Sequence, residues 1–159
     1  MIQDFVKAWE TNKDYLRDYF ASNEQENYNS YKRLIGLMFS HVINPYLMCN
    51  GKQCFDLNRL HEIDDGEYQG TLLYVIPMET YQPSFFEYVI TYVGYGSCSG
   101  CDALMAISYC KDGLPTDEQV NDYMKLCLHI LQHFKYVFDI KECNCQFPVP
   151  GNVMAENAI

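Results

Sequence analysis

Hydrophobic residues recur at intervals of three and four along the first part of the chain. They do so over 2–20 and again over 26–43, and the second run stops before Pro45. This spacing is typical of an amphipathic helix, and a proline disfavours helical backbone in the residue that precedes it. The pattern therefore predicts two helices that are joined by a short polar link and form an N-terminal helical hairpin.

The middle of the chain changes to the composition of β-strands. Residues 46–69 show no regular pattern and end in an acidic, turn-like stretch. The runs 71–77 and 86–93 are rich in β-branched and aromatic residues, which favours strands. Pro77 and Pro83 lie between them, and they predict that a loop connects the two strands.

Helical spacing returns in the last third of the chain. A short helix is predicted from about Asp102 to Tyr109. A longer one is predicted over 116–138, because Thr116 and Gln119 have the spacing of a capping box. We therefore expect an α+β fold in which a small antiparallel sheet packs against the N-terminal hairpin and a long C-terminal helix. The expected organisation is a single domain over 1–140, followed by a loosely ordered tail over 141–159, where prolines, glycine and polar residues predominate.

Charge and composition narrow the classes of function. The net charge is −10, with 21 acidic and 11 basic residues and no basic run, so direct binding to nucleic acid is not expected. An acidic surface suits docking onto a basic surface of another protein. The chain also has 14 tyrosines and 9 phenylalanines, which either fill the core or form a recognition surface.

The expected location is the cytosol. No apolar run approaches the roughly 20 residues that span a bilayer, and the first residues do not resemble a signal peptide. The eight cysteines are therefore expected to be reduced thiols rather than disulfides.

A glycine-rich turn that carries Cys98 and Cys101 follows the second predicted strand. Two thiols at such a turn can ligate a metal, cycle as a redox pair or simply pack. His129 and His133 are one helical turn apart, so the four residues have both internal spacings of a Cys2His2 zinc site. We predict zinc bound by Cys98, Cys101, His129 and His133, which requires the last helix to fold back over the turn.

Helix geometry argues against this assignment, because both histidines lie roughly opposite the main apolar stripe and flank Leu126, Ile130 and Val137 instead. Substitute ligands are Cys110, Cys127 or the pair Cys143 and Cys145.

The order of strand, Cys-x-x-Cys and helix also suggests a thioredoxin-type redox pair. Cys98 would then be the nucleophile and Cys101 the resolving thiol. The further strands that a thioredoxin domain needs after the motif helix are not predicted in this chain.

Three sequence segments resemble those of a known group of proteins: Tyr95-Gly-Ser-Cys-Ser-Gly-Cys-Asp102, Asp64-Asp-Gly-Glu-Tyr-Gln-Gly-Thr71 and Leu126-Cys-Leu-His-Ile-Leu-Gln132. In these segments the chain resembles small uncharacterised proteins encoded by bacteriophages and prophages. The resemblance implies the cytosol of an infected bacterium and a role beside the host machinery. Of the four predicted zinc ligands, Cys98, Cys101 and His129 lie within these segments, whereas His133 lies just beyond them.

These observations favour a non-enzymatic phage protein that binds, and inhibits, a host protein such as a defence factor. The acidic charge, the excess of tyrosine and the lack of a recognisable catalytic motif all favour it. The alternative is a metal- or thiol-dependent enzyme built on the turn that carries Cys98 and Cys101. The sequence does not indicate the oligomeric state.

Overall fold

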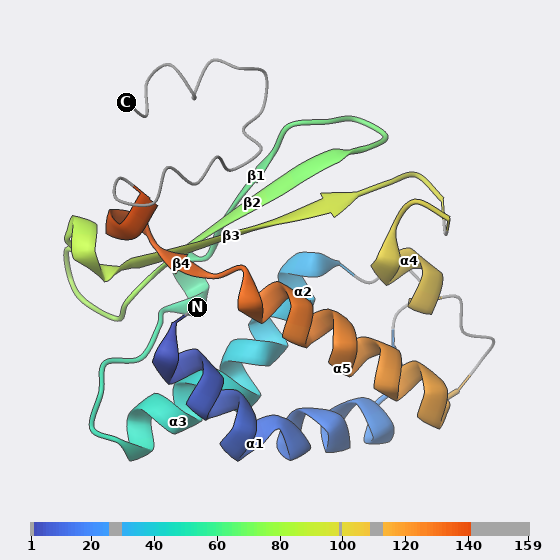
Figure 1. Ribbon diagram of the computed structural model, residues 1–159, viewed down its shortest axis with the longest axis horizontal. Helices are drawn as coiled ribbons and strands as arrows, with labels where there is room; N and C mark the ends of the chain where they lie inside the picture. Colours follow the sequence, from blue (N-terminus) through green and yellow to red (C-terminus); the bar gives the residue numbers. More distant parts are fainter. Residues whose placement is uncertain (1, 26–29, 99, 109–112, 141–159) are drawn as a thin grey trace.

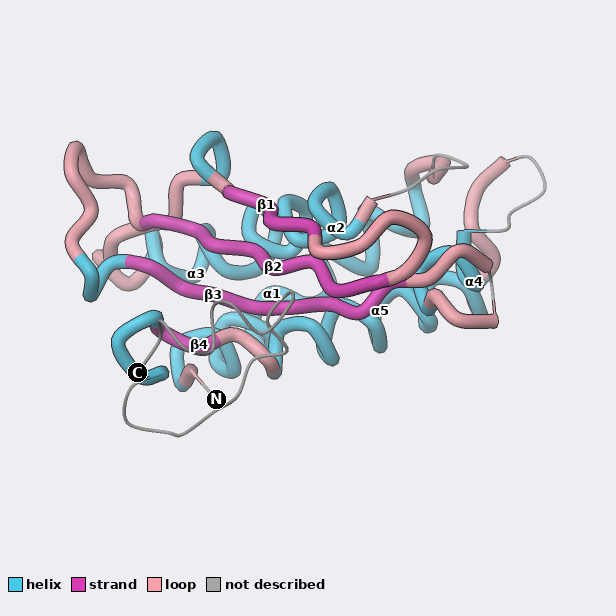
Figure 2. The backbone as a smooth tube through the Cα atoms, turned by 90° about the horizontal axis from the view of Figure 1, so that it is seen from above, coloured by secondary structure: helices cyan, strands magenta, loops and turns pink. Residues whose placement is uncertain are grey.

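The computed structural model describes residues 2–25, 30–98, 100–108 and 113–140. Within these ranges the helices are α1 (Gln3–Ser22), α2 (Tyr31–Met38), α3 (Asn44–Cys49), α4 (Ala103–Ser108) and α5 (Asp117–Gln132), and the strands are β1 (His61–Asp64), β2 (Gly70–Pro77), β3 (Tyr88–Tyr95) and β4 (Lys135–Tyr136). The strands form one antiparallel sheet in the order β1-β2-β3-β4. The helices lie on one side of this sheet (Figures 1 and 2). The predicted α+β architecture is confirmed, and the predicted tail, 141–159, lies outside the described residues.

The second predicted helix continues past Pro45. α2 begins after Ser30, whose side chain accepts a hydrogen bond from the amide of Arg33, and residues 26–29 lie outside the described ranges. A π-helical turn, Phe39–Ile43, then leads directly into α3. The prediction that the helix ends before Pro45 is wrong, because the proline falls in the first turn of α3, where its missing amide hydrogen is not needed.

The sheet has more strands than the sequence pattern predicted. β1 lies inside the region 46–69 that was expected to be irregular, and it pairs with β2 along its whole length. β3 begins at Tyr88 rather than at residue 86, because Phe85–Glu87 form a 3-10 turn. The edge strand β1 was missed because a four-residue strand with mostly exposed side chains has no strong period-two pattern.

The long C-terminal helix is shorter than predicted. α5 begins at the expected capping box of Thr116 and Gln119, but it ends at Gln132 rather than at residue 138. Lys135 and Tyr136 leave the helix and pair with β3 as strand β4. The backbone groups of these residues thus bond to the edge of the sheet instead of extending the helix.

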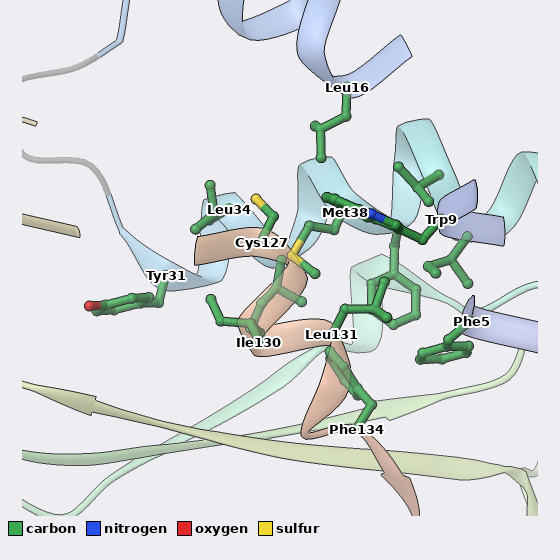
Figure 3. Close-up of a cluster of buried hydrophobic side chains, with 14 of the residues drawn as sticks. Phe5, Trp9, Leu16, Tyr31, Leu34, Met38, Cys127, Ile130, Leu131 and Phe134 are labelled. Carbon is green, nitrogen blue, oxygen red and sulfur yellow. The ribbon is translucent and has the colours of Figure 1, made fainter. Parts of the chain in front are cut away.

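The core lies between the helices and the inner face of the sheet. Val89, Thr91 and Val93 of β3 point inward, and the Thr91 hydroxyl lies 3.5 Å from the carbonyl oxygen of Ile130 in α5. Figure 3 shows side chains from α1, α2 and α5 gathered in this core. Four phenylalanines pack edge to face at the end of the core near α3. They are Phe5, Phe39, Phe55 and Phe134.

Phe5 should be one of the most sensitive positions for stability. Its ring centroid lies 5.7 Å from that of Phe39, 5.8 Å from that of Phe55 and 5.5 Å from that of Phe134. We expect Phe5→Ala to lower the free energy of unfolding by about 3–5 kcal/mol, because it removes these contacts and leaves a cavity. Urea unfolding followed by circular dichroism measures the change. Tyr15→Ala is the matched control in the same helix. The Tyr15 side chain is 65% exposed, so its loss should cost less than about 0.5 kcal/mol, and equal losses for the two variants would contradict this account of the core.

Candidate functional site

The two predicted cysteine ligands lie in the turn between β3 and α4, at one end of the sheet (Figure 1). Both side chains are exposed to solvent. The carbonyl oxygen of Cys98 accepts hydrogen bonds from the amides of Cys101, at 3.1 Å, and Asp102, at 3.0 Å. These bonds close a tight turn that keeps the two cysteines close together.

The buried carboxylate of Asp102 fastens this turn to the rest of the protein. Its Oδ1 accepts hydrogen bonds from the amides of Leu104, at 3.0 Å, and Met105, at 3.1 Å, which is the arrangement of a helix N-cap. The same oxygen accepts a hydrogen bond of 2.7 Å from the hydroxyl of Tyr31. The other oxygen, Oδ2, accepts one of 3.1 Å from the amide of Gly96. One side chain therefore connects the end of β3, the start of α4 and the start of α2.

Tyr31 is held as a hydrogen-bond donor to this carboxylate. Its side chain is only 4% exposed, and burial, together with the neighbouring Asp102, raises the pKa of its phenol well above the usual value. The phenol therefore stays protonated. Figure 3 shows Tyr31 at the edge of the core cluster with its hydroxyl pointing away from Leu34 and Ile130.

The two thiols differ in their surroundings. The neighbouring Cys101 side chain and the backbone amides of Gly100 and Cys101 hold the pKa of the Cys98 thiol below its usual value. The Cys101 thiol itself lies 3.4 Å from the carbonyl oxygen of Cys98, to which it donates. Cys98 is therefore the thiol whose anion the turn stabilises.

Gly96 leaves the space that the Cys101 side chain occupies. A Cβ atom at position 96 would lie 2.8 Å from both the Cβ and the Sγ of Cys101, which is closer than van der Waals contact. Any larger residue at position 96 would displace the Cys101 thiol or the turn.

His129 and His133 lie side by side on α5. Their ring centroids are 4.6 Å apart, and Nδ1 of His133 lies 2.6 Å from the carbonyl oxygen of His129. They line a pocket of about 170 Å³, whose other lining residues are Tyr31, Tyr92, Val93, Gly94, Ala103, Leu126 and Ile130. Leu126 and Ile130 lie beside the histidines as expected. Val137, which was expected on the same edge, lies beyond the end of α5 in the 3-10 turn Val137–Asp139.

The fold brings the cysteine turn near the two histidines without joining the four side chains. α4 packs against α5, and Ala103, two residues after Cys101, lines the same pocket as His129. Across the described residues, however, no three or more His, Cys, Asp or Glu side chains are grouped so that they could hold a metal ion. Zinc at Cys98, Cys101, His129 and His133 therefore stays a prediction from the sequence.

Of the substitute ligands, only Cys127 lies within the described residues. Cys127 is fully buried in the core, where burial raises the pKa of its thiol far above the usual value. Cys110, Cys143 and Cys145 lie outside the described residues. Of the other two cysteines, Cys49 is exposed and Cys54 is partly buried.

Exposed aromatic side chains lie on the loop between β2 and β3, at the other end of the sheet from the cysteine turn (Figure 1), and Phe138 of the 3-10 turn Val137–Asp139 lies beside this loop. We call Tyr81, Phe85, Phe86 and Phe138 the aromatic tip. Tyr81 is 96% exposed, Phe85 45% and Phe86 65%, and the ring of Phe86 lies 5.4 Å from that of Phe138 between centroids. The tyrosine and phenylalanine content left an exposed aromatic surface open as an alternative to core packing, and the sequence did not locate these residues.

Hydrogen bonds hold the loop of the aromatic tip in place. The guanidinium group of Arg59 donates to the carbonyl oxygens of Met78, at 3.2 Å, and Thr80, at 2.6 Å. Ser84 and Glu87 form a reciprocal capping box around the 3-10 turn. The aromatic side chains thus extend from a backbone that is already ordered.

Comparison with known proteins does not identify a family. No protein family, curated protein or solved structure matches the chain. Within the described part of the chain, no helix combines the length and the apolar character that crossing a bilayer requires.

The hydrogen bond between Tyr31 and Asp102 should contribute measurably to stability. We expect Tyr31→Phe to lower the free energy of unfolding by about 1.5–3 kcal/mol, as for a buried hydrogen bond to a charged group. Asp102→Asn should cost more, since it affects every bond of the carboxylate. A double-mutant cycle, measured by urea unfolding, should give a coupling energy of about 0.5–3 kcal/mol.

Tyr95→Phe is the control for this cycle. Its hydroxyl also donates to a carboxylate, that of Asp64, at 2.6 Å, but the pair is exposed. We expect a much smaller loss of stability, because water replaces an exposed hydrogen bond. Additive effects of Tyr31→Phe and Asp102→Asn would show that the two side chains do not act together.

Proposed function

We propose that this chain is a non-enzymatic phage protein that binds, and thereby inhibits, a host protein such as a defence factor in the bacterial cytosol. The observation that carries the proposal is the aromatic tip, where three large side chains are exposed on one short loop. Exposed aromatic side chains that gather in one place are characteristic of surfaces that bind other proteins.

The order of the loop favours binding. Side chains and backbone that must be immobilised on association reduce the affinity, and a surface that is already ordered avoids much of that cost. The bonds from Arg59 and the capping box of Ser84 and Glu87 order this loop in the free protein. Aromatic residues with these properties commonly contribute most of the binding energy of an interface.

The charge of the chain indicates the chemistry of the partner. The net charge of −10 attracts a basic surface and accelerates encounter with it. Near the aromatic tip, Glu79 is exposed and Glu87 is partly exposed. The partner that fits best is a protein with an apolar pocket for the aromatic rings and with lysine or arginine side chains around it.

Affinity purification from a host lysate tests this function. The tagged chain should capture a partner in stoichiometric amounts, and the double variant Tyr81→Ser/Phe86→Ser should lose it. For aromatic residues at the centre of an interface we expect a loss of at least about 2 kcal/mol, or roughly thirtyfold in Kd. Titration calorimetry with the purified partner measures the loss, and the affinity should fall as the salt concentration rises.

Tyr68→Ser is the matched control for this experiment. Tyr68 is 78% exposed but lies in the connection between β1 and β2 rather than in the aromatic tip. It should retain the partner with unchanged affinity. A partner that binds the Tyr81→Ser/Phe86→Ser variant as tightly as the unchanged chain would exclude the aromatic tip as the binding surface.

A further inference from the structure

The turn between β3 and α4 has the geometry that a reversible disulfide needs. The hydrogen bond from the amide of Cys101 to the carbonyl oxygen of Cys98 is that of a four-residue turn, in which the first and last Cα atoms lie within about 7 Å. Cα atoms of disulfide-bonded cysteines lie about 4.4–6.8 Å apart. The two sulfur atoms can therefore bond without rearrangement of the sheet.

The turn is anchored independently of the two thiols. Asp102 accepts hydrogen bonds from Gly96, before the cysteines, and from Leu104 and Met105, after them. None of these bonds involves a sulfur atom. The turn should therefore keep its shape whether the cysteines are reduced or oxidised.

The two cysteines have different roles because their surroundings differ. The Cys101 side chain turns back toward the backbone, because its thiol donates to the carbonyl oxygen of Cys98 and its sulfur lies against Gly96. The Cys98 sulfur takes no part in that bond and is exposed, and the pKa of its thiol is held below the usual value. The thiolate is the attacking species in thiol–disulfide exchange. Cys98 thus corresponds to the attacking thiol and Cys101 to the resolving thiol.

We propose that Cys98 and Cys101 form a thiol–disulfide exchange site that acts on accessible disulfides of small molecules or proteins. The Cys98 thiolate attacks one sulfur of the substrate disulfide, forms a mixed disulfide and releases the first substrate thiolate. Cys101, after losing its proton to water, attacks Sγ of Cys98 and releases the second. The substrate gains two electrons and becomes two thiols, and the cysteine pair loses two electrons and becomes a disulfide. The reaction is one stoichiometric exchange per cysteine pair rather than a catalytic cycle, so it does not make the chain an enzyme, and it is independent of binding through the aromatic tip.

Trapping of the mixed disulfide tests the proposal on the full-length chain. Cys101→Ser removes the resolving thiol, so this variant should accumulate an adduct at Cys98 when it is mixed with glutathione disulfide or with a peptide dimer that is linked by one disulfide. The unchanged chain should instead form the bond between Cys98 and Cys101 and lose two hydrogen atoms in mass. Reaction with both probes indicates a general exchange site, and reaction with the peptide dimer alone indicates a protein substrate.

The rate of alkylation by iodoacetamide gives a second readout. At neutral pH Cys98 should react faster than the cysteine thiol of a short peptide, because the turn lowers the pKa of the Cys98 thiol and a larger fraction of it is ionised. Its rate should reach half of the maximum at a lower pH than that of the peptide thiol. Cys101→Ser should move this midpoint upward if the Cys101 thiol stabilises the Cys98 thiolate.

Cys49→Ser is the matched control, since Cys49 is also exposed and should contribute neither adduct nor disulfide. Three results would overturn the proposal. These are an adduct that forms equally at Cys49 and Cys98, a pair that stays reduced in excess of both glutathione disulfide and the peptide dimer, and stoichiometric zinc in the purified chain together with an unreactive Cys98.

Discussion

The end of the sheet that carries the cysteines depends on the buried carboxylate of Asp102. A carboxylate can be withdrawn from water only when hydrogen-bond donors replace its hydration, and here three backbone amides and the Tyr31 hydroxyl do so. α4 has only six residues, too few to form a stable helix by itself. The bonds to Asp102 and the packing on α5 therefore determine where this helix begins. They also determine the conformation of the turn before it.

β3 connects the two regions to which we assign functions. It begins beside the aromatic tip and ends at the cysteine turn, and its eight residues extend over about 27 Å. Val89 and Val93 on its inner face pack against the helices. Within the sheet, β3 pairs with β2 on one side and with β4 on the other. A strand that is paired on both sides and packed on the helices keeps the two regions apart, at opposite ends of the sheet.

The sequence predicted the features that depend on neighbouring residues. The capping box at Thr116 and the turn carrying Cys98 and Cys101 are local in this sense, and the structure contains both. Features that depend on distant partners were missed. β4 exists because two residues after α5 meet the edge of β3, and Tyr31 reaches Asp102 across 71 positions of the chain. Asp102 alone left a local signal, an aspartate immediately before a helix, which is a preferred N-cap residue.

Zinc binding and thiol exchange make opposite demands on the same turn. Zinc requires its ligands within about 2.0–2.3 Å, so the cysteine turn and the histidine pair of α5 would have to approach each other, against the hydrogen bonds that anchor Asp102. It would also require the Cys101 thiol to lose the proton that it donates to the carbonyl oxygen of Cys98. Thiol exchange needs only the turn as it stands, with two exposed cysteines next to each other. The anchoring by Asp102 holds the two cysteines in that arrangement, so exchange and metal binding would use the same turn in two different conformations.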